Sequence, residues 1–215
     1  MKTSVILNFV LAVAVVALGI KAVQNSNGGD AAKPDAAKEN TEKKGTLQSF
    51  DIKESLSVRP FTFFTGDGLL LCAGDSTSAN AMTIGWGALG TLWGKPAVTV
   101  YVRQGRHTHE FMERSPYFTV MTFSDKNVLR YMGTHSGRDG DKAKALGLHT
   151  LYTENGTPYY AEADTVIECR TMYAGLMTEK GFRSEIPSEF YGAHEDGGGF
   201  HSEYIGEVVG ALRRQ

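Results

Sequence analysis

The segment 80–117 contains residues whose types suit a flat ring at one end and a phosphate at the other. Trp86 and Trp93 lie among four glycines, and glycine lets a backbone approach a flat ligand closely. Arg103 and Arg106 flank a tight turn directly before a helical pattern. Free N–H groups at a helix start, with arginines beside them, suit a phosphate. A ring and one phosphate describe a mononucleotide, and FMN fits best.

A second cluster of the phosphate-binding type lies in the segment 133–142, GTHSGRDGDK. Ser136 and Arg138 supply a hydroxyl and a guanidinium on either side of a glycine. We interpret His135 as a loop or phosphate-side residue rather than a general base, because no partner that would orient it is visible. Asp141 is expected to cap the helix that follows.

These two segments and two later ones, ADTVIECR at 163–170 and HSEYIGE at 201–207, resemble the flavin reductase-like, FMN-binding split-barrel family. The four blocks occur in the order typical of the family, and the resemblance covers roughly 55–212. It implies a mostly β fold, a six-stranded split β-barrel with a few short helices. Such proteins are commonly homodimers with FMN at the subunit interface.

The resemblance, read together with the residue types, gives a set of candidate FMN contacts. The ring is expected to lie against Asn80, Met82, Thr83, Gly85 and Trp86. The phosphate is expected at Arg103, Arg106, Thr108, Ser136 and Arg138. Core packing explains Met82 equally well, and Trp93 could instead pack between subunits.

No residue is assigned a catalytic role. Hydride transfer to a flavin is the cofactor's own chemistry, so a protein acid–base pair is not required. Neither a G-x-S-x-G nor an H-E-x-x-H motif occurs. His194, Glu195, Asp196 and His201 could be arranged as metal ligands, but three consecutive glycines among them favour a mobile loop, so no metal is assigned.

Alternating apolar residues and few helical patterns predict an antiparallel barrel. Between Trp86 and Ala97 the glycines predict a loop. Strands are predicted at Phe61–Phe64, Leu69–Ala73, Ala81–Trp86, Ala97–Arg103, Tyr117–Phe123, Ala163–Tyr173 and Glu203–Leu212. Helices are predicted at Thr108–Arg114, Lys126–Met132 and Asp141–Leu146.

Composition excludes some classes of function. The chain has 215 residues and a net charge of −2 without a basic stripe, so a nucleic-acid partner is not expected. Cys72 and Cys169 both lie in apolar, strand-like runs. They are expected to be buried, unreactive thiols, and a disulfide would be possible only in an exported domain.

The N-terminal region divides into two parts. Residues 1–23 are predicted to be a signal peptide or a membrane anchor, because an apolar run follows Lys2. Residues 24–46 have almost no apolar bulk and are predicted to be a disordered tether. The folded domain is then 47–215. Lysines after the apolar run favour a cytoplasmic domain, whereas a cleaved signal would export it; export or an outward-facing anchor is slightly favoured.

The first functional hypothesis is an FMN-dependent NAD(P)H oxidoreductase that delivers electrons to a small molecule or a protein. No dinucleotide fingerprint occurs, so NADH or NADPH would bind against flavin and loop rather than in its own domain. The alternative is an FMN-holding electron carrier that a partner protein reduces. A third hypothesis is an interaction protein with a vacant flavin-like fold.

Overall fold

The structure is a computed structural model, and it describes residues 45–66, 68–186, 188–192 and 199–215. The predicted signal peptide or anchor at 1–23 lies outside the described residues, as does the tether apart from Gly45 and Thr46. Among the described residues, no helix has both the length and the apolar character to cross a membrane.

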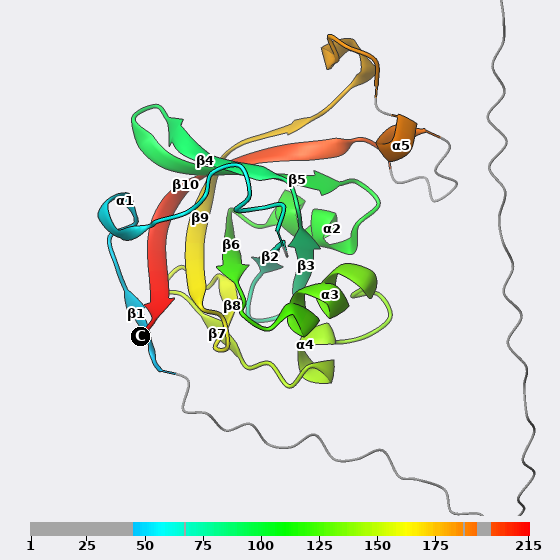
Figure 1. The fold of residues 1–215 in the computed structure, drawn as a ribbon. Coiled ribbons are helices and arrows are strands. Elements are labelled where there is room, and N and C mark those ends of the chain that lie inside the picture. The colour runs from blue at the N-terminus through cyan, green and yellow to red at the C-terminus, as the bar shows by residue number, and fades with distance from the viewer. Residues whose placement is uncertain (1–44, 67, 187, 193–198) are drawn as a thin grey trace, which may run out of the picture. The chain divides into compact units, whose positions relative to one another are not determined.

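Antiparallel strands dominate the described residues, as Figure 1 shows, and the mostly β prediction is confirmed. The main sheet has eight strands rather than six, in the order β3-β2-β6-β9-β10-β5-β4, with β1 pairing with β10. A separate hairpin joins β7 to β8. The strands are β1 Leu47–Ser49, β2 Leu69–Gly74, β3 Ala79–Ile84, β4 Gly87–Leu92, β5 Lys95–Arg103, β6 Tyr117–Thr122, β7 Thr150–Tyr152, β8 Pro158–Tyr160, β9 Thr165–Leu176 and β10 His201–Arg214.

Short helices fill the connections. Asp125 caps α3 by accepting a hydrogen bond from the Asn127 N–H at 2.9 Å, and Asp141 caps α4 through the Lys144 N–H at 3.0 Å. All three predicted helices are present. The helices are α1 Ile52–Ser55, α2 His107–Arg114, α3 Lys126–Thr134, α4 Lys142–Ala145, α5 Ser188–Tyr191 and the 3-10 helix η1 Glu179–Gly181.

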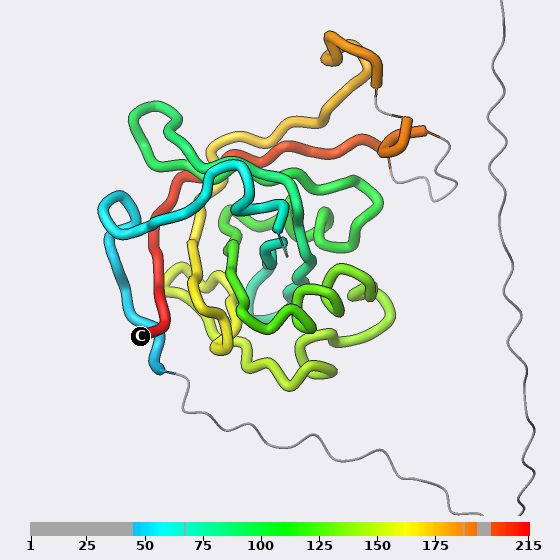
Figure 2. Tube along the Cα trace, viewed as in Figure 1, coloured from blue at the N-terminus to red at the C-terminus, as the bar shows by residue number. Residues whose placement is uncertain are grey.

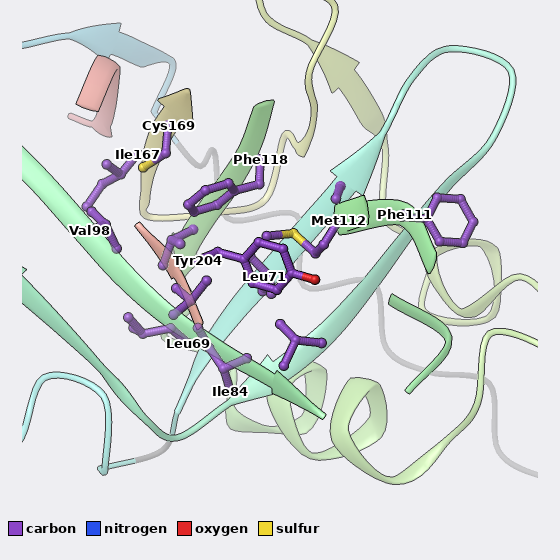
Figure 3. Close-up of a cluster of buried hydrophobic side chains, with 14 of the residues drawn as sticks. Leu69, Leu71, Ile84, Val98, Phe111, Met112, Phe118, Ile167, Cys169 and Tyr204 are labelled. Carbon is purple, nitrogen blue, oxygen red and sulfur yellow. The ribbon is translucent and has the colours of Figure 1, made fainter. Parts of the chain in front are cut away.

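The core lies on both faces of β2 and β6. Leu71 and Phe118 face one cluster, inside the curled sheet and under α2 (Figure 3). Leu70 and Met121, which lie an odd number of residues from Leu71 and Phe118 along their strands, face a second cluster that α3 covers. The side-chain period of two in a strand produces this division, and the alternation predicted for β6 is therefore confirmed.

β9 and β10 are the longest strands, and the main sheet bends along them. Their register shifts at Ile205/Gly206 and at Val208/Gly210, and such irregularities bend a strand. A Cβ at Gly206 would lie 2.7 Å from both the Cys169 Cβ and the Phe118 ring. Figure 2 shows the outer parts of both strands projecting as an arm, while β1 lies along the far end of β10.

Two sequence predictions about elements are wrong. Phe61–Phe64 forms a turn rather than a strand: Phe64 is buried at 3 % exposure, whereas Phe61 is 93 % exposed. The expected loop after Trp86 contains β4, which forms a hairpin with β5. Trp93 stands in that hairpin turn with φ 52° and 73 % exposure.

Cys72 and Cys169 are both buried and free. Burial raises the pKa of Cys72 to about 12 and that of Cys169 further still. Both thiols are therefore protonated at neutral pH and unreactive, which is the first of the two readings of the sequence.

Candidate functional site

Two adjoining cavities lie at the free edge of β3. The first, here the Trp86 cavity, has a volume of about 280 Å³. The second, here the Arg138 cavity, has a volume of about 230 Å³. Met82 and Arg106 line both of them, so the two cavities adjoin at these two side chains.

The structure brings together all the residues predicted to hold the cofactor. Six line the Trp86 cavity: Met82, Thr83, Gly85, Trp86, Arg103 and Arg106. The Arg138 cavity is lined by Asn80, Thr108, Ser136 and Arg138, in addition to the two shared residues.

β3 is the last strand of the sheet, so one of its edges is unpaired. The Ala81 carbonyl accepts a hydrogen bond from the Lys142 Nζ at 2.6 Å, outside the sheet. Peptide groups of alternate residues point to the same side of an antiparallel strand, so those of Thr83 point outward too. Beyond Thr83, a Cβ at Gly85 would have no other atom within 4 Å. The edge can therefore present backbone donors and acceptors to a ligand.

Trp86 and His201 form one wall of the Trp86 cavity. Their ring centroids are 4.9 Å apart at an interplanar angle of 44°. Burial, followed by the charges of Arg103 and Arg106, lowers the pKa of His201 to about 4. The imidazole is therefore neutral at physiological pH.

The turn before α2 carries the two arginines that flank the cavities. The Arg106 N–H donates to the Arg103 carbonyl at 3.0 Å, and Arg106 then occupies the N-cap position of α2 without a side-chain cap bond. The Arg103 Nε donates to the Gly199 carbonyl at 3.0 Å. Since the first N–H groups of a helix have no intrahelical acceptor, the Arg106 guanidinium and this helix start form an anion-attracting corner.

The loop after α3 lies directly against β3. The Asn80 Nδ2 donates to the Thr108 Oγ1 at 2.7 Å, which joins the start of β3 to the start of α2. A Cβ at Gly137 would lie 1.9 Å from the Asn80 Oδ1. Only glycine fits there, and Asn80 and Thr108, both buried, form the wall of the Arg138 cavity rather than projecting into it.

Arg138 connects the two predicted phosphate clusters. Its Nη1 donates to the Gly105 carbonyl at 3.2 Å, and its Nη2 forms an ion pair with Glu110. Next to that pair, the His107 Nδ1 is buried without a hydrogen-bond partner and lies 3.4 Å from the Glu110 Oε1. At this corner the Arg138 guanidinium and the His107 imidazole therefore both lie against the Glu110 carboxylate.

Lys142 is a residue that the sequence analysis missed. It is buried beside the Arg138 cavity, and besides the Ala81 carbonyl its Nζ donates to the carbonyls of Met132 and His135, each at 3.1 Å. Burial lowers its pKa. It fastens the end of α3 to the edge of β3. Its place at the end of the block 133–142 was the only signal in the sequence.

His135 lies at the end of α3 and stacks on Tyr131, with ring centroids 3.8 Å apart. It lines the Arg138 cavity, as the loop-side prediction expects. Of the four possible metal ligands, His194, Glu195 and Asp196 lie outside the described residues. Within the part of the chain that the structure describes, no three His, Cys, Asp or Glu residues are grouped as a metal site.

Comparison with known proteins identifies the family and the fold. Residues 63–214 match the family model described as "Flavin reductase like domain". No curated protein sequence matches the chain, whereas several solved structures do.

Three of these structures illustrate the match. An FMN-binding domain of a flavin reductases-like enzyme from Shewanella baltica is 17% identical, with a TM-score of 0.55 over 79% of this chain and 78% of that one. A flavoredoxin from Methanosarcina acetivorans is 22% identical, with a TM-score of 0.51 over 76% and 74%. The NADH:FAD oxidoreductase SgcE6 of Streptomyces globisporus is 21% identical, with a TM-score of 0.50 over 69% and 78%.

The fold thus places the molecule in the class of flavin reductase-like split barrels. The match over most of the chain is decisive for the family: the protein belongs to the flavin reductase like domain family. The predicted family and fold class are therefore confirmed.

Proposed function

We propose that the protein is an FMN-binding oxidoreductase that NADH or NADPH reduces. The observation that carries the proposal is that the two cavities adjoin at Met82 and Arg106, which line both of them. One cavity has an aromatic wall and a free strand edge, which suit a flat ring. The other has a helix start, two arginines and a hydroxyl-bearing loop, which suit a phosphate.

The described residues fit FMN on three further points. The outward peptide groups at Thr83 can pair with the alternating donors and acceptors of the flavin's pyrimidine edge. The open space at Gly85 leaves room for the ring. The Ser136 hydroxyl accepts the Arg138 N–H at 3.1 Å, so its own proton remains for a phosphate oxygen.

Bound FMN would supply the two-electron chemistry of its ring. This chain's residues bind the cofactor, orient it and exclude water. Arg106 neutralises the phosphate at the corner that the two cavities share. Trp86 and the neutral His201 form an uncharged wall beside the ring. A nicotinamide then needs only a stacking position beside the ring, because hydride transfer requires geometry rather than a protein base.

A second candidate function is an electron carrier reduced by a partner protein. It is favoured by the exposure of the aromatic rim of the Trp86 cavity, where Trp86 is 38 % exposed and Phe190 is 42 % exposed. Exposed aromatic side chains beside a cofactor site are typical of protein contacts.

Anaerobic addition of NADH or NADPH to the purified, flavin-loaded protein separates the two functions. We expect the flavin absorbance to bleach without any other protein, and oxygen to restore it. A His135→Ala variant should bleach at the same rate, because His135 lies at the end of α3, stacked on Tyr131. Bleaching by dithionite alone, with neither nicotinamide effective at millimolar concentration, would favour the carrier.

A further inference from the structure

A third cavity, of about 280 Å³, opens beside the Trp86 cavity and is almost wholly apolar. Met177, Phe182 and Tyr191 line it, and all three belong to the connection between β9 and β10. The two cavities also share Trp86, Tyr101, Phe190 and His201. We name this third cavity the arm pocket. A ligand in it would touch the same residues as a ring in the Trp86 cavity.

Aromatic rings form the walls of the arm pocket in mainly edge-to-face arrangements. The Trp86 and Phe190 centroids are 4.8 Å apart at 86°. Phe182 and Tyr191 are 5.9 Å apart at 71°. Walls of this kind present both faces and edges to an inserted ring, which is the geometry that aromatic contacts prefer. The pocket therefore suits a flat, uncharged ring.

One polar group stands at the junction with the Trp86 cavity. The Tyr191 hydroxyl lies 2.8 Å from the His201 Nδ1. When that hydroxyl donates, the ring proton of the neutral imidazole is on Nε2, which can then donate to a ligand. A carbonyl oxygen on the ring would satisfy this donor.

We propose that the arm pocket binds an electron acceptor of the quinone class, a flat uncharged ring that carries carbonyl groups, beside the flavin. The proposal rests on the function proposed above and adds the acceptor's class to it. Two electrons and two protons leave the reduced flavin, the quinone becomes a hydroquinone and the flavin is oxidised again. The nicotinamide that reduced the flavin would have supplied a hydride, and solvent the second proton, so the overall step balances.

The test uses two variants of residues that line the arm pocket but not the Trp86 cavity, Phe182→Ala and Met177→Ala. The matched control is Tyr173→Ala, an exposed aromatic residue of β9 that is not part of the pocket lining. Calorimetry with 1,4-naphthoquinone measures binding directly, with or without bound flavin. Steady-state rates with 1,4-naphthoquinone and with ferricyanide, a small anion that needs no apolar pocket, measure turnover.

We expect Phe182→Ala to weaken naphthoquinone binding and to raise its KM about tenfold, because the variant removes one aromatic wall. Met177→Ala should also weaken naphthoquinone binding and raise its KM. If circular dichroism shows that Phe182→Ala is unfolded, Met177→Ala alone decides the test. Ferricyanide turnover and FMN affinity should match the parent. The Tyr173→Ala protein should behave as the parent in every assay.

Three results would overturn the proposal. The first is naphthoquinone binding that is absent in the parent or unchanged in both pocket variants. The second is a raised KM for NADH with an unchanged KM for the quinone, which would assign the pocket to the nicotinamide. The third is a loss of dimer on sedimentation without a change in quinone binding, which would assign it to a second copy. A protein that binds naphthoquinone but takes up no FMN would instead contradict the proposed function alone.

Discussion

At the scale of single residues, Arg106 is the first candidate to bind the phosphate, because it lines both cavities and its side chain makes no cap hydrogen bond at the start of α2. Arg103 and Arg138 already donate to the protein, to Gly199 and to Gly105 respectively. The sequence indicated these three side chains through their spacing around a turn and a loop. It could not indicate which of them was already paired, because their acceptors are distant in sequence.

Replacement of Arg106 by alanine should weaken FMN binding about ten- to a hundredfold. A lost charge-assisted hydrogen bond costs about 1.5–3 kcal/mol, which corresponds to that change in affinity. Arg138→Ala should have a smaller effect, because its ion pair with Glu110 already engages the guanidinium. Fluorescence titration of the apoprotein with FMN measures each dissociation constant.

The control for charge alone is Arg130→Ala, since Arg130 is an exposed α3 residue that donates to Asn127. It should bind FMN as the parent does. If Arg106→Ala also binds as tightly as the parent, the phosphate does not lie at the start of α2.

His201 gives the fold a dependence on pH. Its pKa in the folded protein is about 4, below the ordinary value of 6.5. As the pH falls through 6.5 the unfolded chain takes up this proton first, so stability is lost progressively towards pH 4. The urea midpoint of the parent should therefore fall over this range.

The same titration of His201→Gln isolates the contribution of this histidine from those of the carboxylates. We expect a smaller fall in the midpoint for the variant than for the parent between pH 6.5 and 4. Parallel curves would mean that His201 is protonated as readily in the folded protein as in the unfolded chain.

At the scale of elements, the hydrophobic periodicity of the sequence predicted the strands of the core. It failed for segments in which few side chains are fully buried. The continuous apolar run of β2 matches its burial on both faces, and the period of two in β6 divides its side chains between the two core clusters. β4 was missed because none of its residues is fully buried and two are glycines, so no apolar pattern marks the strand. Phe61–Phe64 looked like a strand, but only one of its four side chains is fully buried. The role of Lys142 could not be predicted from the sequence, because the three carbonyls that accept its hydrogen bonds belong to separate segments of the chain.

The contact between the loop after α3 and β3 can be tested with Gly137→Ala. The new Cβ would lie 1.9 Å from the Asn80 Oδ1; since the Asn80 side chain is buried and bonded to Thr108, we expect the loop to move away from β3. FMN affinity should fall at least tenfold, because a displaced phosphate-side loop loses contacts of about 1.5 kcal/mol or more. The titration used for the arginine variants measures this effect.

Gly90→Ala is the matched control for Gly137→Ala. It lies in β4, where a Cβ would have no atom within 4 Å, and it should leave FMN affinity unchanged. Equal affinities for Gly137→Ala and Gly90→Ala would show that the loop does not contribute to the site.

At the scale of the whole molecule, β3, α2, the loop after α3 and the arm of β9 and β10 meet around one pair of adjoining cavities. Residues before Gly45 supply none of these elements, whereas β1 pairs with the end of β10. A chain that begins at Gly45 should therefore keep the fold and the site.

The most direct test of the central claim, that the paired cavities bind FMN, is the absorption spectrum of purified 45–215 together with chromatography of the released cofactor. The predicted result is a yellow protein that releases FMN rather than FAD, because the phosphate site proposed for the Arg138 cavity takes a single phosphate. A colourless protein that takes up no FMN on incubation would contradict the account.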